Sequence, residues 1–477
     1  MEEYQPLGQS KASAKANGSG IEINQQDVSM TDAIDDKDLT PEEIASSITV
    51  NLLDIVAPVE DASAELTELP ELWDGQLAYR RPQSAEWLPL TDESFKIFND
   101  LSSLEEHHRE KIRSYKSNLS ELLSSSLQLP NLGFFAGSGT SLAEVKGPSM
   151  WGLWKESMGF DMKAKSISMA AEAVCNTVKY SERDNPNIEH FLSQCDAYLS
   201  FQYDKDVNDF VLDVKRVILE RCSTFLDESD SDISSYTGLL QKLARRRVRD
   251  PRLRVFTTNY DMCFETAASE LGMMVVDGLS YTRKRRFDGQ YFNFDIVRRD
   301  SENHEFVEGI FQLYKLHGSV SWQREQGDVF EYLKPSAEDA CLIYPAKGKY
   351  QQAFLQPHLE LLSRFLEFLR QPNSCLIMAG FGFNDDHLSE PIYSSIKSNP
   401  SLKLIITDFK CARHIGHSGS FGSSNYWQKF SELALRGYDI HFVNGSFRDF
   451  VDKIPHLKAL SPAEQLVNAV KRAGAGR

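Results

Sequence analysis

The sequence has no apolar run long enough to cross a membrane, and its first residues carry two acids without the apolar segment of a secretory signal. None of its seven cysteines forms a CxxC pair, which argues against a zinc site built from paired cysteines. It also lacks the GK[ST] of a P-loop, the HExxH of a zinc protease and any repeat of 20 to 50 residues. We therefore expect a cytoplasmic protein with reduced thiols that is neither a P-loop nucleotide triphosphatase nor a solenoid.

The charge balance argues against a general affinity for polyanions. The 477 residues include 69 acids and 52 bases, a net charge of −17, which disfavours non-specific binding to nucleic acid or anionic membranes. With 41% hydrophobic and 25% charged residues the composition is that of a soluble globular protein. The length suits about three domains, or one α/β core with insertions.

The chain divides by composition into four stretches. Residues 1–45 hold ten acids against three bases and few apolar side chains, which predicts a disordered acidic tail. A helical extension is expected over 46–128 and an α/β domain over 129–455, with a helical insert at about 150–250. The remainder, 456–477, is expected to be a C-terminal helix or tail.

Short apolar runs separated by helical patterns predict the fold class. Strands are expected at 132–136, 254–258, 311–316, 374–379, 403–407 and 439–443, and helices at 164–180, 188–201, 207–225 and 358–370. Such an alternation is typical of a Rossmann-like α/β fold with a mostly parallel sheet covered on both faces. Ligands of such sheets bind outside the carboxyl ends of the strands, so the residues that close each strand are the candidate site.

The first of these strands runs into a glycine turn. Gly137 and Gly139 would let the backbone approach a phosphate closely, and Ser138, Thr140 and Ser141 add hydroxyls. The turn is followed by Leu142 where a dehydrogenase fingerprint has its third glycine. A plain turn without a ligand is the alternative.

The next two strands end in an asparagine and a histidine. An amide at the end of a buried strand needs polar partners, so Asn259 is a candidate to hold a ribose hydroxyl or a water; an Asn-Tyr-Asp turn or a helix cap is the alternative. His317 titrates near neutrality and is a candidate general base. Because its sequence context has no HxxxH or HExxH spacing, we expect no metal site there.

Two later strand ends complete the candidate site. Gly380 ends a buried strand where a ligand could press on the backbone, and Asp385 or Asp386 is expected to cap the following helix. Asp408 closes another strand and could accept hydrogen bonds from ribose hydroxyls.

In this order and spacing, the motifs GSGTS, TTNYD, KLHGS and GFGFNDDHL resemble those of the sirtuin superfamily, in particular its bacterial sirtuin-like branch of anti-phage defence, over about 130–450. The resemblance implies NAD as ligand. By match, the pyrophosphate would be cradled by Gly137, Ser138, Gly139, Thr140 and Ser141. Asn259 would contact the nicotinamide ribose and position water, Asp261 would meet the carboxamide, and His317 would remove a proton. Gly380, Phe381 and Asp408 would line the adenosine half.

The departures from the family narrow the expected chemistry. No cysteine pairs follow His317, and 147–154 (GPSMWGLW) replaces the usual Pro-Asp-Phe-Arg stretch, so acyl-lysine chemistry is disfavoured and no zinc is expected. The resemblance then implies an NAD glycohydrolase that uses NAD as substrate, releases nicotinamide and ADP-ribose, and depletes cellular NAD during phage infection. A non-catalytic NAD or ADP-ribose sensor, a protein deacylase or ADP-ribosyltransferase, and a purely structural subunit are the alternatives.

The partners implied by the resemblance are further copies of the chain in a homo-oligomer and a hexameric HerA-type ATPase. Two basic runs, 244–249 and 283–286, are interpreted as solvated faces, and direct binding to nucleic acid is not expected.

Overall fold

The computed structural model describes residues 69–183, 186–228, 230–247, 250–299, 304–342, 356–416 and 424–456. All of them lie in one compact unit, Thr67–Arg477. The expected acidic tail over 1–45, the first part of the expected extension and the expected C-terminal helix or tail beyond 456 lie outside the described residues.

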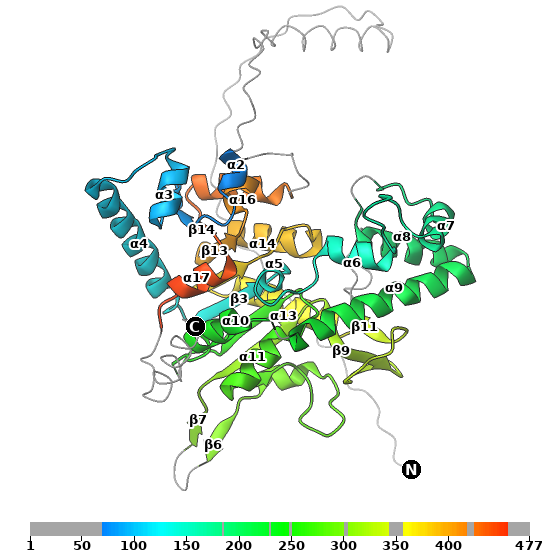
Figure 1. The fold of residues 1–477 in the computed structure, drawn as a ribbon. Coiled ribbons are helices and arrows are strands. Elements are labelled where there is room, and N and C mark those ends of the chain that lie inside the picture. Colours follow the sequence, from blue (N-terminus) through cyan, green and yellow to red (C-terminus); the bar gives the residue numbers. More distant parts are fainter. Residues whose placement is uncertain are drawn as a thin grey trace, which may run out of the picture. The chain divides into compact units, whose positions relative to one another are not determined.

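A nine-stranded sheet forms the centre of the described unit, in the order β2-β1-β14-β13-β12-β3-β4-β8-β5 (Figure 1). All neighbouring pairs from β14 to β5 are parallel, whereas β1 pairs antiparallel with both β14 and β2. Its strands are β1 (Ala78–Arg80), β2 (Leu88–Pro89), β3 (Asn131–Ala136), β4 (Leu253–Thr257), β5 (Met274–Val276), β8 (Ile310–Lys315), β12 (Ser374–Ala379), β13 (Leu402–Asp408) and β14 (Ile440–Asn444). The mostly parallel α/β fold predicted from the sequence is confirmed.

Successive side chains of the central strands enter two different cores. Phe134 packs into one core and Phe135 into the other, and both are fully buried. This follows from the two-residue period of a strand, and it explains why the central strands are apolar at nearly every position. A sheet buried on both faces leaves only the strand ends for polar, functional side chains.

Helices cover both faces of the sheet. The first core includes residues of α4, α10, α11 and α17, and the second includes residues of α13, α14 and α16. The described helices outside the insert are α2 (Leu69–Leu72), α3 (Asp92–Phe98), α4 (Glu106–Ser126), α5 (Gly139–Leu142), α10 (Ser234–Leu243), α11 (Cys263–Leu271), α13 (His358–Arg370), α14 (Asp386–Ser398), α15 (Cys411–Gly416), α16 (Tyr426–Leu435) and α17 (Phe447–Lys453), with short 3₁₀ helices at Phe225–Asp227 and Gly289–Asn293.

Between β3 and β4 the chain makes a helical insert with its own core. Its helices are α6 (Met150–Ser157), α7 (Met169–Thr177), α8 (Ile188–Phe201) and α9 (Lys205–Thr224). Polar N-caps start all four of them, because a side-chain oxygen accepts hydrogen bonds from first-turn N–H groups at Ser149, Ser168, Asn187 and Asp204. Figure 1 shows the four helices gathered together, and their core also includes Val320 and Leu342 from neighbouring strands.

Those two strands belong to a small sheet outside the main one, with the order β10-β9-β11. A second small sheet pairs β6 with β7. Their strands are β6 (Val297–Arg299), β7 (His304–Phe306), β9 (Gly318–Glu325), β10 (Asp328–Glu331) and β11 (Ala340–Leu342). Because β9 begins right after His317, it anchors the chain directly behind that residue.

The structure differs from the sequence-based expectation in three regions. The expected helical extension also contains β1 and β2, which are too short to show an alternating pattern, and α3 and α4 are separate helices. The helix expected from 164 begins only at Met169, where Ser168 caps it. Within the stretch expected as helical insert, α10 packs into the core of the main sheet instead of that of the insert.

Asn444 ties the start of the described chain to the main sheet. It is fully buried, its Nδ2 donates to the carbonyls of Trp73 and Gln76 at 2.7 Å each, and its Oδ1 accepts the Ala412 N–H at 2.9 Å. We predict that Asn444→Ala lowers the free energy of unfolding by about 3 kcal/mol, since one buried and two partly buried backbone groups lose their partner. Denaturant unfolding monitored by circular dichroism measures this.

The matched control is Asn425→Ala, because Asn425 is exposed and makes no capping hydrogen bond. It should change stability by less than about 0.5 kcal/mol. Equal effects of the two substitutions would contradict the assigned role of Asn444.

Candidate functional site

Four strand ends meet at one edge of the main sheet. β12, β3, β4 and β8 are neighbours in that order and all parallel, so their carboxyl ends point the same way. The loops that follow them carry the four motifs found in the sequence. Polar side chains from distant parts of the chain are thereby brought together where parallel sheets bind ligands.

The glycine loop after β3 packs directly against the loop after β12. A Cβ on Gly137 would lie 2.4 Å from the Gly380 oxygen, and a Cβ on Gly139 would lie 2.7 Å from the Gly380 Cα. The N–H groups of Gly137 and Gly139 donate to the carbonyls of Ala379 and Gly380, at 2.9 Å each. The glycines are therefore required by the contact between the two loops, and these two N–H groups already have protein acceptors.

The hydroxyls of the same loop divide into two roles. Thr140 is buried, its Oγ1 donates to the Gly137 carbonyl at 2.8 Å, and it lies 2.8 Å from the Tyr236 hydroxyl. Ser138 and Ser141 instead line the cavity described below. Within this loop, the serines are the residues placed to meet a ligand.

Asn259 presents a buried oxygen without a partner. Its side chain is 8% exposed, and its Nδ2 donates to Thr140 Oγ1 and Ser141 Oγ at 3.3 Å each. Its N–H donates to Thr257 Oγ1 at 3.0 Å, which fixes the backbone. Among the described residues, no group hydrogen-bonds to the buried Oδ1. An unsatisfied buried acceptor costs about 1–3 kcal/mol, so this atom fits a hydroxyl or water of a bound ligand.

Asp261 and Lys315 fix the ends of β4 and β8 to one another. Lys315 is buried, and its Nζ donates to the Asp261 carbonyl at 2.5 Å, to Glu265 Oε1 at 2.9 Å and to Ser319 Oγ at 2.9 Å. Asp261 Oδ1 accepts the Cys263 N–H at 3.1 Å, at the start of α11. Burial raises the pKa of Glu265, and the Lys315 ammonium opposes that rise.

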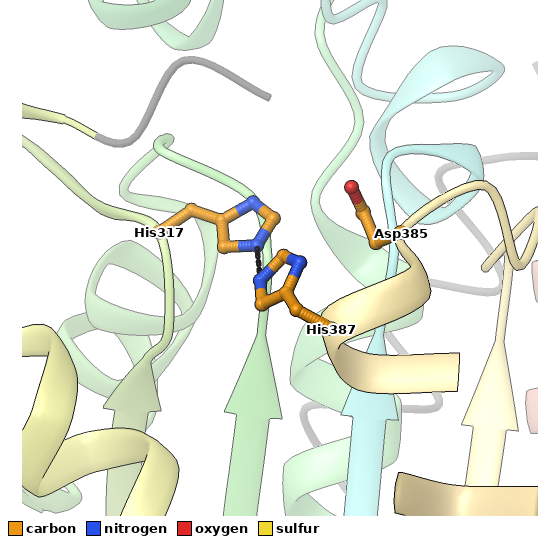
Figure 2. Close-up of side chains that lie close together, drawn as sticks. All are labelled: His317, Asp385 and His387. Atoms are coloured by element: carbon orange, nitrogen blue, oxygen red, sulfur yellow. Dashed lines mark hydrogen bonds between the residues drawn. The ribbon is translucent and has the colours of Figure 1, made fainter. Parts of the chain in front are cut away.

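His317 lies at the end of β8 beside two residues from the start of α14. Its side chain is 1% exposed, and its Nε2 is 3.1 Å from Nε2 of His387, which is 6% exposed. The two ring planes are inclined by only 24°, and Figure 2 shows one nitrogen of each ring pointing at the other, with Asp385 nearby. Behind His317, His358 Nδ1 is 3.2 Å from the Leu316 carbonyl, and burial lowers the pKa of His358 to about 4, so this ring is neutral near pH 7.

One cavity of about 180 Å³ joins these strand ends to the helical insert. Of the predicted site residues, it is lined by Ser138, Ser141, Asn259, Asp261, His317 and Phe381. The insert contributes Met150 and Leu153 of α6, and Asn187 and Glu189 at the start of α8. The volume is below the roughly 300–1,000 Å³ of typical ligand sites, so the cavity as it stands holds only part of a large ligand.

The other predicted residues do not line this cavity. Gly137, Gly139, Thr140 and Gly380 form the loop contact that carries the lining residues. Asp408, at the end of β13, accepts the Lys410 N–H at 2.8 Å and stays outside the cavity. Burial raises the pKa of Asp408 to about 6.

The sequence interpretation missed the contact of His387 and Asp385 with His317. Asp385 is the N-cap residue of α14, as expected, yet its side chain makes no capping hydrogen bond. Spacing along the chain could not reveal the pair of histidines, because 70 residues separate them. The sequence offered one indication of this contact: His387 lies in the motif that follows β12, a strand of the same sheet as β8.

The second basic run is neutralised by acids. Arg285 binds Asp277 at 2.9 Å and Glu331 at 2.8 Å, and Lys284 binds Glu325 at 2.5 Å. In the first run, Arg246 is buried and donates to backbone carbonyls. No helix in the described ranges is both long enough and apolar enough to span a bilayer.

Residues 253–409 match the sequence model of a family described as the SIR2-like domain. This segment is therefore similar to SIR2-like domains. It runs from β4 to just past β13, so it includes Asn259, His317 and Gly380 but not the glycine loop after β3. A SIR2-like domain implies an NAD-dependent activity.

A solved structure titled "Structural Basis for the Mechanism and Regulation of Sir2 Enzymes" is similar at 11% identity, over 70% of this chain and 94% of that chain, with a TM-score of 0.35. No curated protein matches the chain.

We predict that Gly380→Ala destabilises the protein more than Gly272→Ala does. Both glycines have a φ of +62°, but a Cβ on Gly272 has no atom within 4 Å, whereas one on Gly380 lies 2.6 Å from the Thr140 nitrogen. Each alanine incurs about 1–2 kcal/mol for its left-handed backbone. Gly380→Ala should add about 1–3 kcal/mol from the clash between the loops. Denaturant midpoints measure the difference, and equal midpoints would refute the loop contact.

We also predict that Asp408→Asn stabilises the protein near pH 7.5 but not at pH 3.5. Because the folded pKa of about 6 exceeds the ordinary value of 3.8, ionising this partly buried carboxyl costs stability as pH rises between them. That difference corresponds to about 3 kcal/mol at most. Asparagine keeps an acceptor for the Lys410 N–H. Thermal melts at both pH values measure the effect, and an equal gain at both would contradict it.

Proposed function

We propose that the protein is an NAD glycohydrolase, which uses NAD as its substrate and releases nicotinamide and ADP-ribose. The observation that carries the proposal is the unpartnered Oδ1 of Asn259, buried in the same cavity as His317. An acceptor held in this way suits a ribose hydroxyl or the attacking water. The SIR2-like segment, which contains both residues, supports NAD as the ligand.

The proposed reaction needs one bond to break and one to form. The glycosidic bond of the nicotinamide ribose breaks, and its electron pair leaves with nicotinamide. The oxygen of a water forms the new bond to the ribose carbon, and one proton of that water must be removed. Asn259 orients the water and the ribose hydroxyl through its amide, and His317 accepts the proton as general base.

The remaining residues position the substrate. Ser138 and Ser141 offer hydroxyls from the glycine loop to the pyrophosphate, while Gly137, Gly139 and Thr140 keep that loop in place. Asp261 is assigned to the carboxamide. Gly380, Phe381 and Asp408 are assigned to the adenosine half of the ligand. Because Asp408 does not line the cavity, this assignment requires the adenosine half to extend beyond the cavity.

The domain assignment follows from these roles. The catalytic domain is proposed to span 129–455 and to include the helical insert, which contributes part of the cavity wall. The stretches 1–45, 46–128 and 456–477 are assigned no catalytic residue. In the cell the activity is proposed to deplete NAD during phage infection and to be restrained in a homo-oligomer by a HerA-type ATPase partner, as in the defence branch that the motifs resemble.

The proposal is tested by nicotinamide release from NAD, with the full chain in a buffer containing a metal chelator. Asn259→Ala and His317→Ala should each lower the rate at least about 100-fold, the lower end of general acid–base contributions. The matched controls are Asn425→Ala and His107→Ala, because both residues are exposed and distant in sequence from the motifs. They should retain the wild-type rate.

Calorimetry with NAD separates binding from turnover in the same samples. NAD that binds the wild type but is never hydrolysed, with or without an added HerA-type ATPase, would refute the hydrolase and favour a sensor. Release that persists in both active-site variants would refute the assigned roles.

A further inference from the structure

His317, His387 and Asp385 form a cluster of side chains that could hold a metal ion, and two of them, His317 and Asp385, line the cavity. Their candidate ligand atoms all lie within 4.8 Å of one another (Figure 2). The three residues come from two elements, the end of β8 and the start of α14. No other described group of His, Cys, Asp and Glu side chains is arranged in this way.

The distance between the two imidazoles suits a shared cation. In a tetrahedral zinc site with Zn–N bonds of about 2.0–2.1 Å, two ligand nitrogens lie about 3.3–3.4 Å apart. The two Nε2 atoms are 3.1 Å apart, so a shift of a few tenths of an ångström brings both to one ion. Without an ion, the same distance permits only one proton between the two nitrogens.

The three side chains are held in place by the fold. The chain at His317 is fixed because the Leu316 N–H donates to the Thr257 carbonyl at 2.8 Å. The Asp385 carbonyl accepts the N–H groups of Leu388 and Ser389, at 3.0 and 2.8 Å. Asp385 lines the cavity, so it is positioned to meet a ligand there.

The donor set selects the class of ion. Two imidazoles and one carboxylate suit zinc and related divalent transition metals, whereas magnesium and calcium prefer sites made of oxygen atoms. Three protein ligands also leave a position for water or another small ligand, as in exchangeable metal sites. That position would open to the cavity, because His317 and Asp385 both line it.

We propose that His317, His387 and Asp385 bind one zinc-class divalent ion, and that the bound ion withdraws His317 from proton transfer. The first half stands on the cluster alone. The second half rests on the proposed function, in which His317 is the general base. Zinc is then an inhibitor of NAD hydrolysis, because a nitrogen that donates its lone pair to the metal cannot accept a proton.

Direct binding tests the site without reference to activity. Full-length protein stripped with a chelator is titrated with Zn²⁺ in competition with a chromophoric chelator, and one tight site per chain is expected. Cobalt(II) loaded in place of zinc should give visible absorption bands that one equivalent of zinc abolishes. If the wild-type protein neither competes for zinc nor gives cobalt bands, the proposed metal site is refuted. His317 and His387 would then be only a hydrogen-bonded pair.

Matched variants identify the ligands. His387→Gln and Asp385→Asn should each weaken zinc binding by more than about 100-fold. Replacing even a residue that only hydrogen-bonds to a metal ligand lowers metal affinity by about 10–100-fold. The controls are His107→Gln on α4 and Asp386→Asn, whose exposed side chain follows Asp385 in the same turn. Circular dichroism checks the fold of each variant. Unchanged zinc affinity in folded His387→Gln and Asp385→Asn would place the ion elsewhere and refute the assignment.

Activity measurements distinguish a failure of this inference from a failure of the proposed function. In the chelated wild type, one equivalent of zinc should lower nicotinamide release at least about tenfold, and excess chelator should restore it. Zinc binding without any NAD hydrolysis would refute the function but leave the site. Hydrolysis that one bound equivalent of zinc leaves unchanged would refute the inhibitory half of the proposal.

Discussion

The contact between the loops after β3 and β12 is the constraint on which the cavity depends. Gly139 donates its N–H to the Gly380 carbonyl, and a side chain at either position would collide with the other loop. Because these loops touch through their backbones, Ser141 and Phe381, one from each loop, reach the same cavity. The glycines that looked like a phosphate cradle in the sequence thus first serve to join two strand ends.

Around this contact, buried polar groups keep the functional residues in place. Lys315 joins the end of β4 to the end of β8, two residues before His317. Thr140 and Ser141 accept the two hydrogen bonds that the Asn259 amide nitrogen donates. The amide oxygen of Asn259 is then the one atom of that side chain without a partner among the described residues. The proposed catalytic roles of Asn259 and His317 follow from this positioning, and so does the cluster of His317 with His387 and Asp385.

The sequence predicted the sheet and the meeting of its strand ends, and it failed where contacts are distant or elements are short. The six expected strands are found within a few residues of their predicted bounds, because continuous apolar runs of five or six residues mark strands buried on both faces. The pairing of β1 with β14 could not be predicted from a three-residue strand. Nor could the approach of His387 to His317, since it depends on how α14 packs and not on any local pattern.

The most direct test of the account is a mass balance on NAD incubated with the full chain and a metal chelator, measured by mass spectrometry. The account predicts that each NAD lost yields one nicotinamide and one ADP-ribose, with no ADP-ribose attached to the protein. Complete recovery of NAD would contradict it, and so would nicotinamide that appears without an equal amount of free ADP-ribose.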